Sequence, residues 1–231
     1  KITLLFSINV FGQLNGDCNL PYNTADGLVE ILIGEGVEFS NATFSGFSCS
    51  AGLFNGPSNI GFESGLVMAT NGVESINPNN SGGGTSGGPG VDADLTEQLE
   101  IVNASETNLN NLVVLEFDFI PTSDVISFNY VFASNEYPSY TCSDFNDIFG
   151  FFLSGPGING NFENDAINIA LVPDPDDPNT YTDSPVIINT INSGVPSGGY
   201  PASNCANIDP DWEEYSVFFT DNSNTPSVSY P

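Results

Sequence analysis

Cationic side chains are almost absent from this sequence. Its 231 residues include a single Lys or Arg, which is Lys1, and no His, against 29 Asp and Glu, for a formal net charge of −28. Such a chain has no cation with which to hold a phosphate, and it is repelled by nucleic acid and by anionic lipid. The sequence therefore excludes nucleic-acid binding.

The same shortage removes most catalytic chemistry. Without His, and with no Lys after Lys1, the chain lacks the groups for nucleophilic triads, Schiff bases and imidazole acid-base catalysis. A glycosidase that uses two carboxylates, for example Glu136 and Asp147, is the one enzyme class left open. We expect a protein that is not an enzyme.

Apolar residues are plentiful enough for a folded core. The hydrophobic fraction is 39% and the aromatic fraction 12%, with 18 Phe and 8 Tyr. The high net charge therefore does not indicate disorder. Repulsion among the carboxylates must be relieved by something other than internal bases, and bound Ca²⁺ is the cofactor we expect. The alternative is an acidic, solvated surface suited to a salty habitat.

The first residues resemble a secretory signal peptide. Lys1 precedes a short apolar run at residues 2–11, and Val10 and Gly12 fit the −3 and −1 positions of a cleavage site. Residues 1–12 are accordingly predicted to be a signal peptide, with a first β-strand as the alternative. No other apolar run approaches the length of a bilayer, so we expect a secreted or extracellular cell-surface protein without membrane insertion.

Four cysteines fit this exported context. An even number of Cys in such a chain indicates disulfides rather than a metal site, and no C-x-x-C pair is present. Three connectivities are possible. We prefer Cys18 with Cys49 and Cys142 with Cys205, and leave the choice to geometry.

The remaining pattern predicts an all-β fold, a β-sandwich or jelly roll with one or two short helices. Residues 24–33 fit a helix that begins at a Thr cap and ends near Gly34, and residues 92–100 are helix-like. We expect a single domain at 13–231. Residues 220–231 are polar and turn-rich, so we expect this domain to lack its closing strands. Strands are predicted from residue 37 onward and at 60–70, 112–120, 125–133, 148–153, 166–172, 186–191 and 215–219.

One long segment carries a family resemblance. Residues 117–157 read FDFIPTSDVISFNYVFASNEYPSYTCSDFNDIFGFFLSGPG, which resembles the choice-of-anchor L domain of bacterial surface and secreted proteins. INIALV at 167–172 follows in the expected order. Residues 28–46 and IGFESGLVMAT at 60–70 are also similar to the family, so the likeness covers most of the chain after Gln13.

The resemblance implies an exported domain near the N-terminal side of a long surface protein, often delivered by type IX secretion. It implies an adhesive or structural role, including filament building, and no enzymatic activity. The sequence departs from the family where Asn135 replaces an acidic residue before Glu136, and in the missing strands after Pro231.

Acidic turns supply the candidate calcium ligands, because hard cations prefer carboxylate, amide and backbone oxygens on loops. The alternative is that these residues only form Asx turns or a solvated loop tip. The first group comprises Glu136, Asp144, Asn146 and Asp147; the second comprises Asp174, Asp176 and Asp177; a weaker third comprises Asp209, Asp211, Glu213 and Glu214.

Expected partners are surface proteins, neighbouring subunits that add a strand to an open sheet edge, or glycans. The alternative function is a calcium-dependent, lectin-like module, in which exposed Trp212, Tyr137 and Tyr140 contact sugar rings. Core or turn packing of these aromatics is the competing interpretation.

Overall fold

The computed structural model describes most of the chain between residues 15 and 221. Its described residues form two compact units: unit 1 contains those up to residue 73 together with 113–127, and unit 2 contains 89–112 and 128–221. The predicted signal peptide at 1–12 lies outside the described residues, as does Gly34. The described ranges are 15–33, 36–56, 60–70, 72–73, 89–177 and 179–221.

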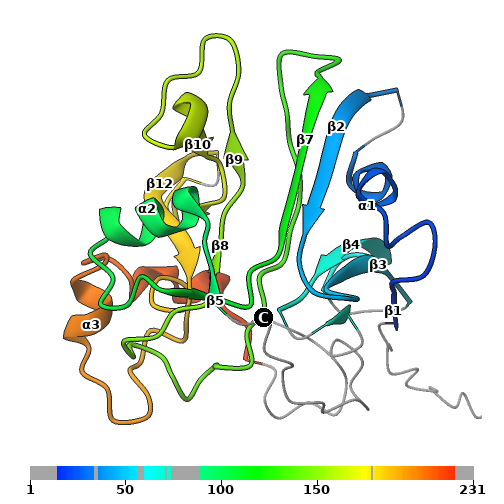
Figure 1. Cartoon of the computed structure of the whole chain (residues 1–231). Helices are drawn as coiled ribbons and strands as arrows, with labels where there is room; N and C mark the ends of the chain where they lie inside the picture. Colours follow the sequence, from blue (N-terminus) through cyan, green and yellow to red (C-terminus); the bar gives the residue numbers. More distant parts are fainter. Residues whose placement is uncertain are drawn as a thin grey trace, which may run out of the picture. The chain divides into compact units, whose positions relative to one another are not determined.

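The described residues of unit 1 form two antiparallel sheets and one α-helix (Figure 1). The longer strands are β2 (Glu38–Ser45) and β7 (Val114–Ile120), which pair with a register shift between Ser40 and Thr43. Asn41 lies within this shift at φ 54°, a left-handed conformation that Asn adopts more readily than most residues. The second sheet has the order β1 (Asn15–Asp17), β3 (Ala51–Asn55) and β4 (Ser64–Met68).

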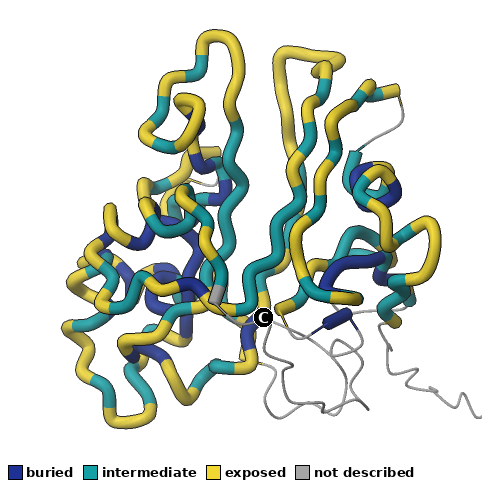
Figure 2. Tube along the Cα trace, viewed as in Figure 1, coloured by how far each residue is buried: buried dark blue, intermediate teal, exposed yellow. Residues whose placement is uncertain are grey.

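The helix of unit 1, α1 (Ala25–Leu32), confirms the helix predicted at residues 24–33. Thr24 Oγ1 accepts a hydrogen bond from the Gly27 N–H at 3.1 Å, which satisfies one of the unpaired donors of the first turn. Leu28 and Val29 are fully buried, and α1 packs against β2, β3, β4 and β7. Its buried face is dark blue in Figure 2.

Unit 2 contains three small antiparallel sheets and several short helices. Its longest described helix is α2 (Ala93–Ile101), which confirms the helix predicted at 92–100. Asp92 caps it, because Asp92 Oδ1 accepts a hydrogen bond from the Leu95 N–H at 2.8 Å. The sheets are β11 (Leu171–Pro173), β12 (Tyr181–Ile187) and β8 (Ile148–Phe149); β10 (Ile167–Asn168) and β9 (Phe152–Leu153); and β5 (Pro89–Gly90) and β6 (Leu109–Asn110). The helices are α2 (Ala93–Ile101), α3 (Ser203–Ala206) and the 3-10 turns η2 (Glu163–Asp165) and η3 (Glu214–Phe218).

The strand predicted at residues 125–133 is wrong, although its alternating pattern is real. No strand is assigned there, but Phe128, Tyr130 and Phe132 are partly buried and the residues between them are exposed. The Phe128 ring stacks on Phe151 at 4.3 Å, and the Tyr130 ring lies 5.1 Å from that of Phe149. Aromatic packing therefore holds this segment without a regular ladder.

The strand predicted at residues 215–219 is also wrong, because η3 occupies this region. Tyr215 is buried there, and its hydroxyl donates to Asp209 Oδ2 at 2.9 Å. The strand predicted at 186–191 ends at Ile187, and those predicted at 148–153 and 166–172 are each divided into two short strands. Local β propensity is thus overridden by the contacts of buried side chains.

Each unit contains one disulfide, and both preferred pairings are confirmed. Cys18 pairs with Cys49 in unit 1 with a Cα–Cα distance of 5.4 Å, and Cys142 pairs with Cys205 in unit 2 at 5.0 Å. The all-β class is confirmed, with the described strands distributed over five antiparallel sheets. None of the helices described is long and apolar enough to span a bilayer.

Candidate functional site

The acidic loop at residues 134–147 of unit 2 is closed by a serine. Ser134 Oγ donates to Asp147 Oδ2 at 2.5 Å and accepts from the Glu136 N–H at 3.0 Å. Ser134 is buried and Asp147 is exposed, so the two bonds are partly shielded from water. This arrangement brings the start and the end of the loop together, and with them two of the predicted calcium ligands.

Asn189 holds the middle of the acidic loop from inside. Its side chain is 1% exposed, accepts from the Cys142 N–H at 2.8 Å and donates to the Ser143 carbonyl at 2.8 Å. Its own N–H donates to Asn146 Oδ1 at 3.1 Å. Nothing in the local sequence distinguishes Asn189 from an ordinary turn residue, and sequence reasoning missed it.

Three further contacts fix the loop. The Tyr137 hydroxyl donates to the Ile191 carbonyl, and the Tyr137 ring makes an edge contact with Phe219 at 5.0 Å. The disulfide formed by Cys142 is fully buried and packs with Trp212. The acidic loop is therefore held by covalent, polar and aromatic contacts to the chain that follows it.

Glu136 is the electrostatically unusual residue of the loop. Burial, and to a lesser extent the negative charge of Asp147, raises the pKa of Glu136 to about 7. The same two causes raise the pKa of Tyr137. Glu136 Oε2 is buried and makes no hydrogen bond among the described residues. Protonation or a bound cation would relieve this arrangement, and the described residues contain no cationic side chain.

The first predicted ligand group is brought together only in part. Glu136 and Asp147 lie close enough to interact electrostatically. Asn146 directs its amide oxygen to Asn189, and exposed Asp144 accepts from Asn204 Nδ2 at 3.3 Å instead. In the part of the chain that the structure describes, no three acidic side chains converge as a metal-binding group.

The second predicted group lies in the loop between β11 and β12 and forms Asx turns. Asp174 Oδ1 accepts from the Asp176 N–H at 2.8 Å, and Asp177 Oδ1 accepts from the Asn179 N–H at 3.0 Å. Each turn stabilises the local backbone without a metal. The geometry matches the alternative interpretation of these residues as loop-forming.

The third predicted group surrounds a buried carboxylate. Asp209 accepts from the Ser184 hydroxyl, from the Tyr215 hydroxyl and, at 2.8 Å, from the Asp211 N–H. Burial and the bond to Asp209 raise the pKa of Tyr215 to about 12. Asp211, Glu213 and Glu214 are exposed. Asp209 thus organises the core of unit 2.

The aromatic residues proposed to contact sugars occupy different environments. Trp212 is 2% exposed, so its predicted exposure is wrong, because its indole packs against the disulfide between Cys142 and Cys205. Tyr137 is mostly buried and its hydroxyl is bonded to a backbone carbonyl. Only Tyr140, at 41% exposure, is open to solvent.

Comparison with protein families gives one match that covers nearly the whole chain. The model of the choice-of-anchor L domain matches residues 18–230 and so spans both compact units. Comparisons with curated proteins and with solved structures find no match. The chain therefore belongs to the choice-of-anchor L domain family, whose members are domains of surface or secreted bacterial proteins.

Proposed function

We propose that this domain is a non-enzymatic adhesive or structural module of the cell surface, with calcium bound between Glu136 and Asp147. The observation that carries the metal claim is the buried, unpartnered Oε2 of Glu136 beside a second carboxylate. An uncompensated buried charge is costly, and no cationic side chain in the described residues can offset it. A divalent cation would offset both negative charges at once.

The chemistry of the site fits calcium better than a transition metal. The available ligands are the carboxylates of Glu136 and Asp147 and the hydroxyl of Ser134, all of them hard oxygen donors. Two carboxylates leave most of the coordination shell to water. We therefore expect weak binding, with a Kd of about 10⁻⁴ to 10⁻³ M, the range of extracellular calcium modules.

Calcium at this place would fix the loop rather than catalyse a reaction. The acidic loop is already held by Asn189, Ile191 and Cys205. An ion that joins its two ends would restrict its motion further. The two disulfides and the family membership support an adhesive or filament-building role outside the cell. Delivery by type IX secretion is part of the same proposal.

The lack of His and of any Lys after Lys1 supports a non-enzymatic role. The whole chain contains no His, and its only cation is Lys1. The carboxylate pair of Glu136 and Asp147 is the remaining candidate for acid-base chemistry, and it is also the proposed ion site. Hydrolysis of chromogenic glycosides by the purified domain, lost in Glu136→Gln, would contradict the proposal.

The experiment for calcium is a calorimetric titration of the domain at about pH 8, where Glu136 is ionised. We expect one weak site in the wild type and at least about tenfold weaker binding in Glu136→Gln, as for the loss of a charged ligand. Glu100→Gln, which removes an exposed carboxylate of α2, is the matched control and should bind like the wild type.

The adhesive role is tested separately with beads coated with the domain. Attachment of the beads to cells or to each other is the expected result. The metal site is overturned if the wild type binds no calcium, or if the wild type, Glu136→Gln and Glu100→Gln bind it equally.

The adhesive role is overturned if the coated beads attach neither to cells nor to each other.

A further inference from the structure

Two surface loops of unit 2 meet at the disulfide between Cys142 and Cys205. One loop carries Tyr140 and the other carries Tyr200, and their rings stack with centroids 6.3 Å apart and an interplanar angle of 28°. Tyr200 also packs against the buried disulfide. An aromatic pair is thus anchored on a covalent cross-link at the surface.

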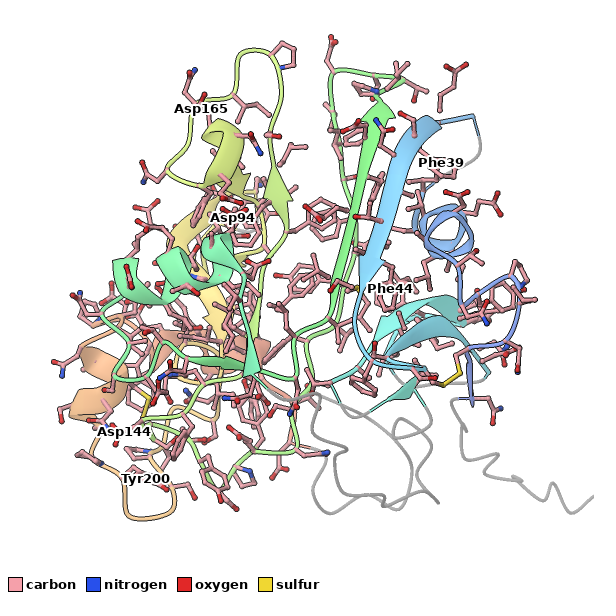
Figure 3. The ribbon with its side chains drawn as sticks, viewed as in Figure 1. Phe39, Phe44, Asp94, Asp144, Asp165 and Tyr200 are labelled. Atoms are coloured by element: carbon pink, nitrogen blue, oxygen red, sulfur yellow. A yellow bond between two sulfur atoms is a disulfide. The ribbon has the colours of Figure 1, made fainter. Side chains whose placement is uncertain are left out.

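A polar pair lies next to the same two cysteines in sequence. Asp144 follows Cys142, Asn204 precedes Cys205, and Asn204 Nδ2 donates to Asp144 Oδ1 at 3.3 Å. Asp144 is exposed and Asn204 is partly exposed. Figure 3 shows Asp144 and Tyr200 at the same end of unit 2. We call the four residues Tyr140, Tyr200, Asp144 and Asn204 the tyrosine platform.

The backbone beneath the tyrosine platform is tightly held. The Ser197 N–H donates to the Thr141 carbonyl at 3.4 Å, which joins the two loops a second time. Gly198 has φ +65°, and a Cβ atom there would lie 2.3 Å from the Ser139 carbonyl oxygen, so the loops approach more closely than another residue would permit. A surface built in this way loses little conformational entropy when it binds a ligand.

The chemistry of the tyrosine platform fits a carbohydrate. Tyr140 is 41% exposed and offers an apolar ring and a hydroxyl, while the carboxylate and amide of the polar pair offer acceptors and a donor for sugar hydroxyls. Binding sites for small molecules commonly combine apolar contact area with a few polar groups that fix the orientation of the ligand.

The negative charge of the domain disfavours binding of anionic carbohydrates. The net charge of −28, with Lys1 as the single cation, repels sulfated, sialylated or uronic-acid glycans. We infer that the tyrosine platform binds a neutral oligosaccharide. The inference rests on the proposed adhesive function and names what the domain adheres to, but it places the sugar away from Glu136 and requires no calcium.

The test is an array of immobilised oligosaccharides that contains neutral glucans, mannans, galactans and chitin oligomers together with sialylated and sulfated glycans. The domain is applied in calcium and in chelator. We expect binding to neutral glycans only, unchanged by chelator. Tyr140→Ala should weaken it about fivefold to tenfold, as for the loss of an aromatic contact. Asp144→Ala should also weaken it.

Phe145→Ala is the matched control, because Phe145 is an exposed aromatic at 55% close to Asp144 but is not part of the tyrosine platform. It should bind like the wild type, and fluorescence of buried Trp212 checks that each variant is folded. Absence of neutral-glycan binding, a preference for anionic glycans, or equal losses in Tyr140→Ala and Phe145→Ala would each overturn the inference. Because bead attachment and calcium binding are measured separately, a failed array leaves the proposed function standing.

Discussion

Ionisation of Glu136 should make the stability of unit 2 depend on pH in a definite direction. Burial and the charge of Asp147 raise the pKa of Glu136 from 4.5 to about 7. The folded state therefore holds this proton more tightly than the unfolded chain, so the free energy of unfolding falls as the pH rises between these values. The loss of stability is absent below about pH 4.5, where the carboxyl is protonated in both states, and complete above about pH 7, where it is ionised in both.

The size of this loss of stability follows from the two pKa values of Glu136. Their difference corresponds to at most about 3 kcal/mol. Glu136 is only partly buried, and solvent screening reduces the contribution to about 1–2 kcal/mol. Calcium would favour the ionised form, so the penalty is expected in chelator and should shrink when calcium is added.

Urea unfolding followed by the fluorescence of Trp212 measures this directly. Trp212 is the single Trp of the chain and is buried in unit 2, the unit that contains Glu136. In chelator, the wild type should lose about 1–2 kcal/mol more stability than Glu136→Gln between about pH 5 and pH 8. Glu100→Gln should follow the wild type. Identical pH dependence in the wild type and Glu136→Gln would show that the ionisation of Glu136 does not affect stability.

Further predictions concern the framework of unit 2, each measured by urea unfolding with Trp212 fluorescence. Asp209→Ala should cost about 3 kcal/mol or more, because it leaves two hydroxyls and an N–H without their acceptor, and a cost below about 1 kcal/mol would contradict the geometry. Asn189→Ala should cost about 2–4 kcal/mol by leaving the Cys142 N–H and a carbonyl unpaired. Cys142→Ser together with Cys205→Ser should cost about 4 kcal/mol, from the loop of 63 residues that the bond closes.

Local signals in the sequence account for the helices. Thr24 and Asp92 cap α1 and α2 with their own side chains, and a cap followed by spaced apolar residues is visible without tertiary information. The long strands β2 and β7 are likewise encoded by their alternation. These elements were predictable because each depends on residues close to it in the chain.

The errors arise where distant residues decide the structure. The pattern of Phe128, Tyr130 and Phe132 is correct about which side chains face inward, but periodicity cannot show whether the backbone also forms a ladder. Tyr215 is held in η3 by Asp209, which no strand propensity reveals. The prediction of a single domain stays a prediction, since one family match spans two compact units.

The sequence predicts that residues 134–147 form an acidic loop, but it does not show which of the acidic side chains lie together. Glu136 and Asp147 lie near each other because Ser134, 13 positions before Asp147, is bonded to both, whereas Asp144 is bonded to Asn204 instead. The side chain that organises the loop, Asn189, is more than 40 positions away in sequence. Sequence composition indicates that acidic loops need a counter-charge, and only the fold shows which carboxyl oxygen lacks one.

The melting temperature of the domain in calcium and in chelator, at about pH 8, shows whether an ion binds between Glu136 and Asp147. At a calcium concentration about a hundredfold above Kd, one bound ion adds about 2.7 kcal/mol, or about 5–10 °C for a chain of this length. We expect that shift in the wild type and a much smaller one in Asp147→Asn. A wild-type protein that melts at the same temperature in both buffers would contradict it.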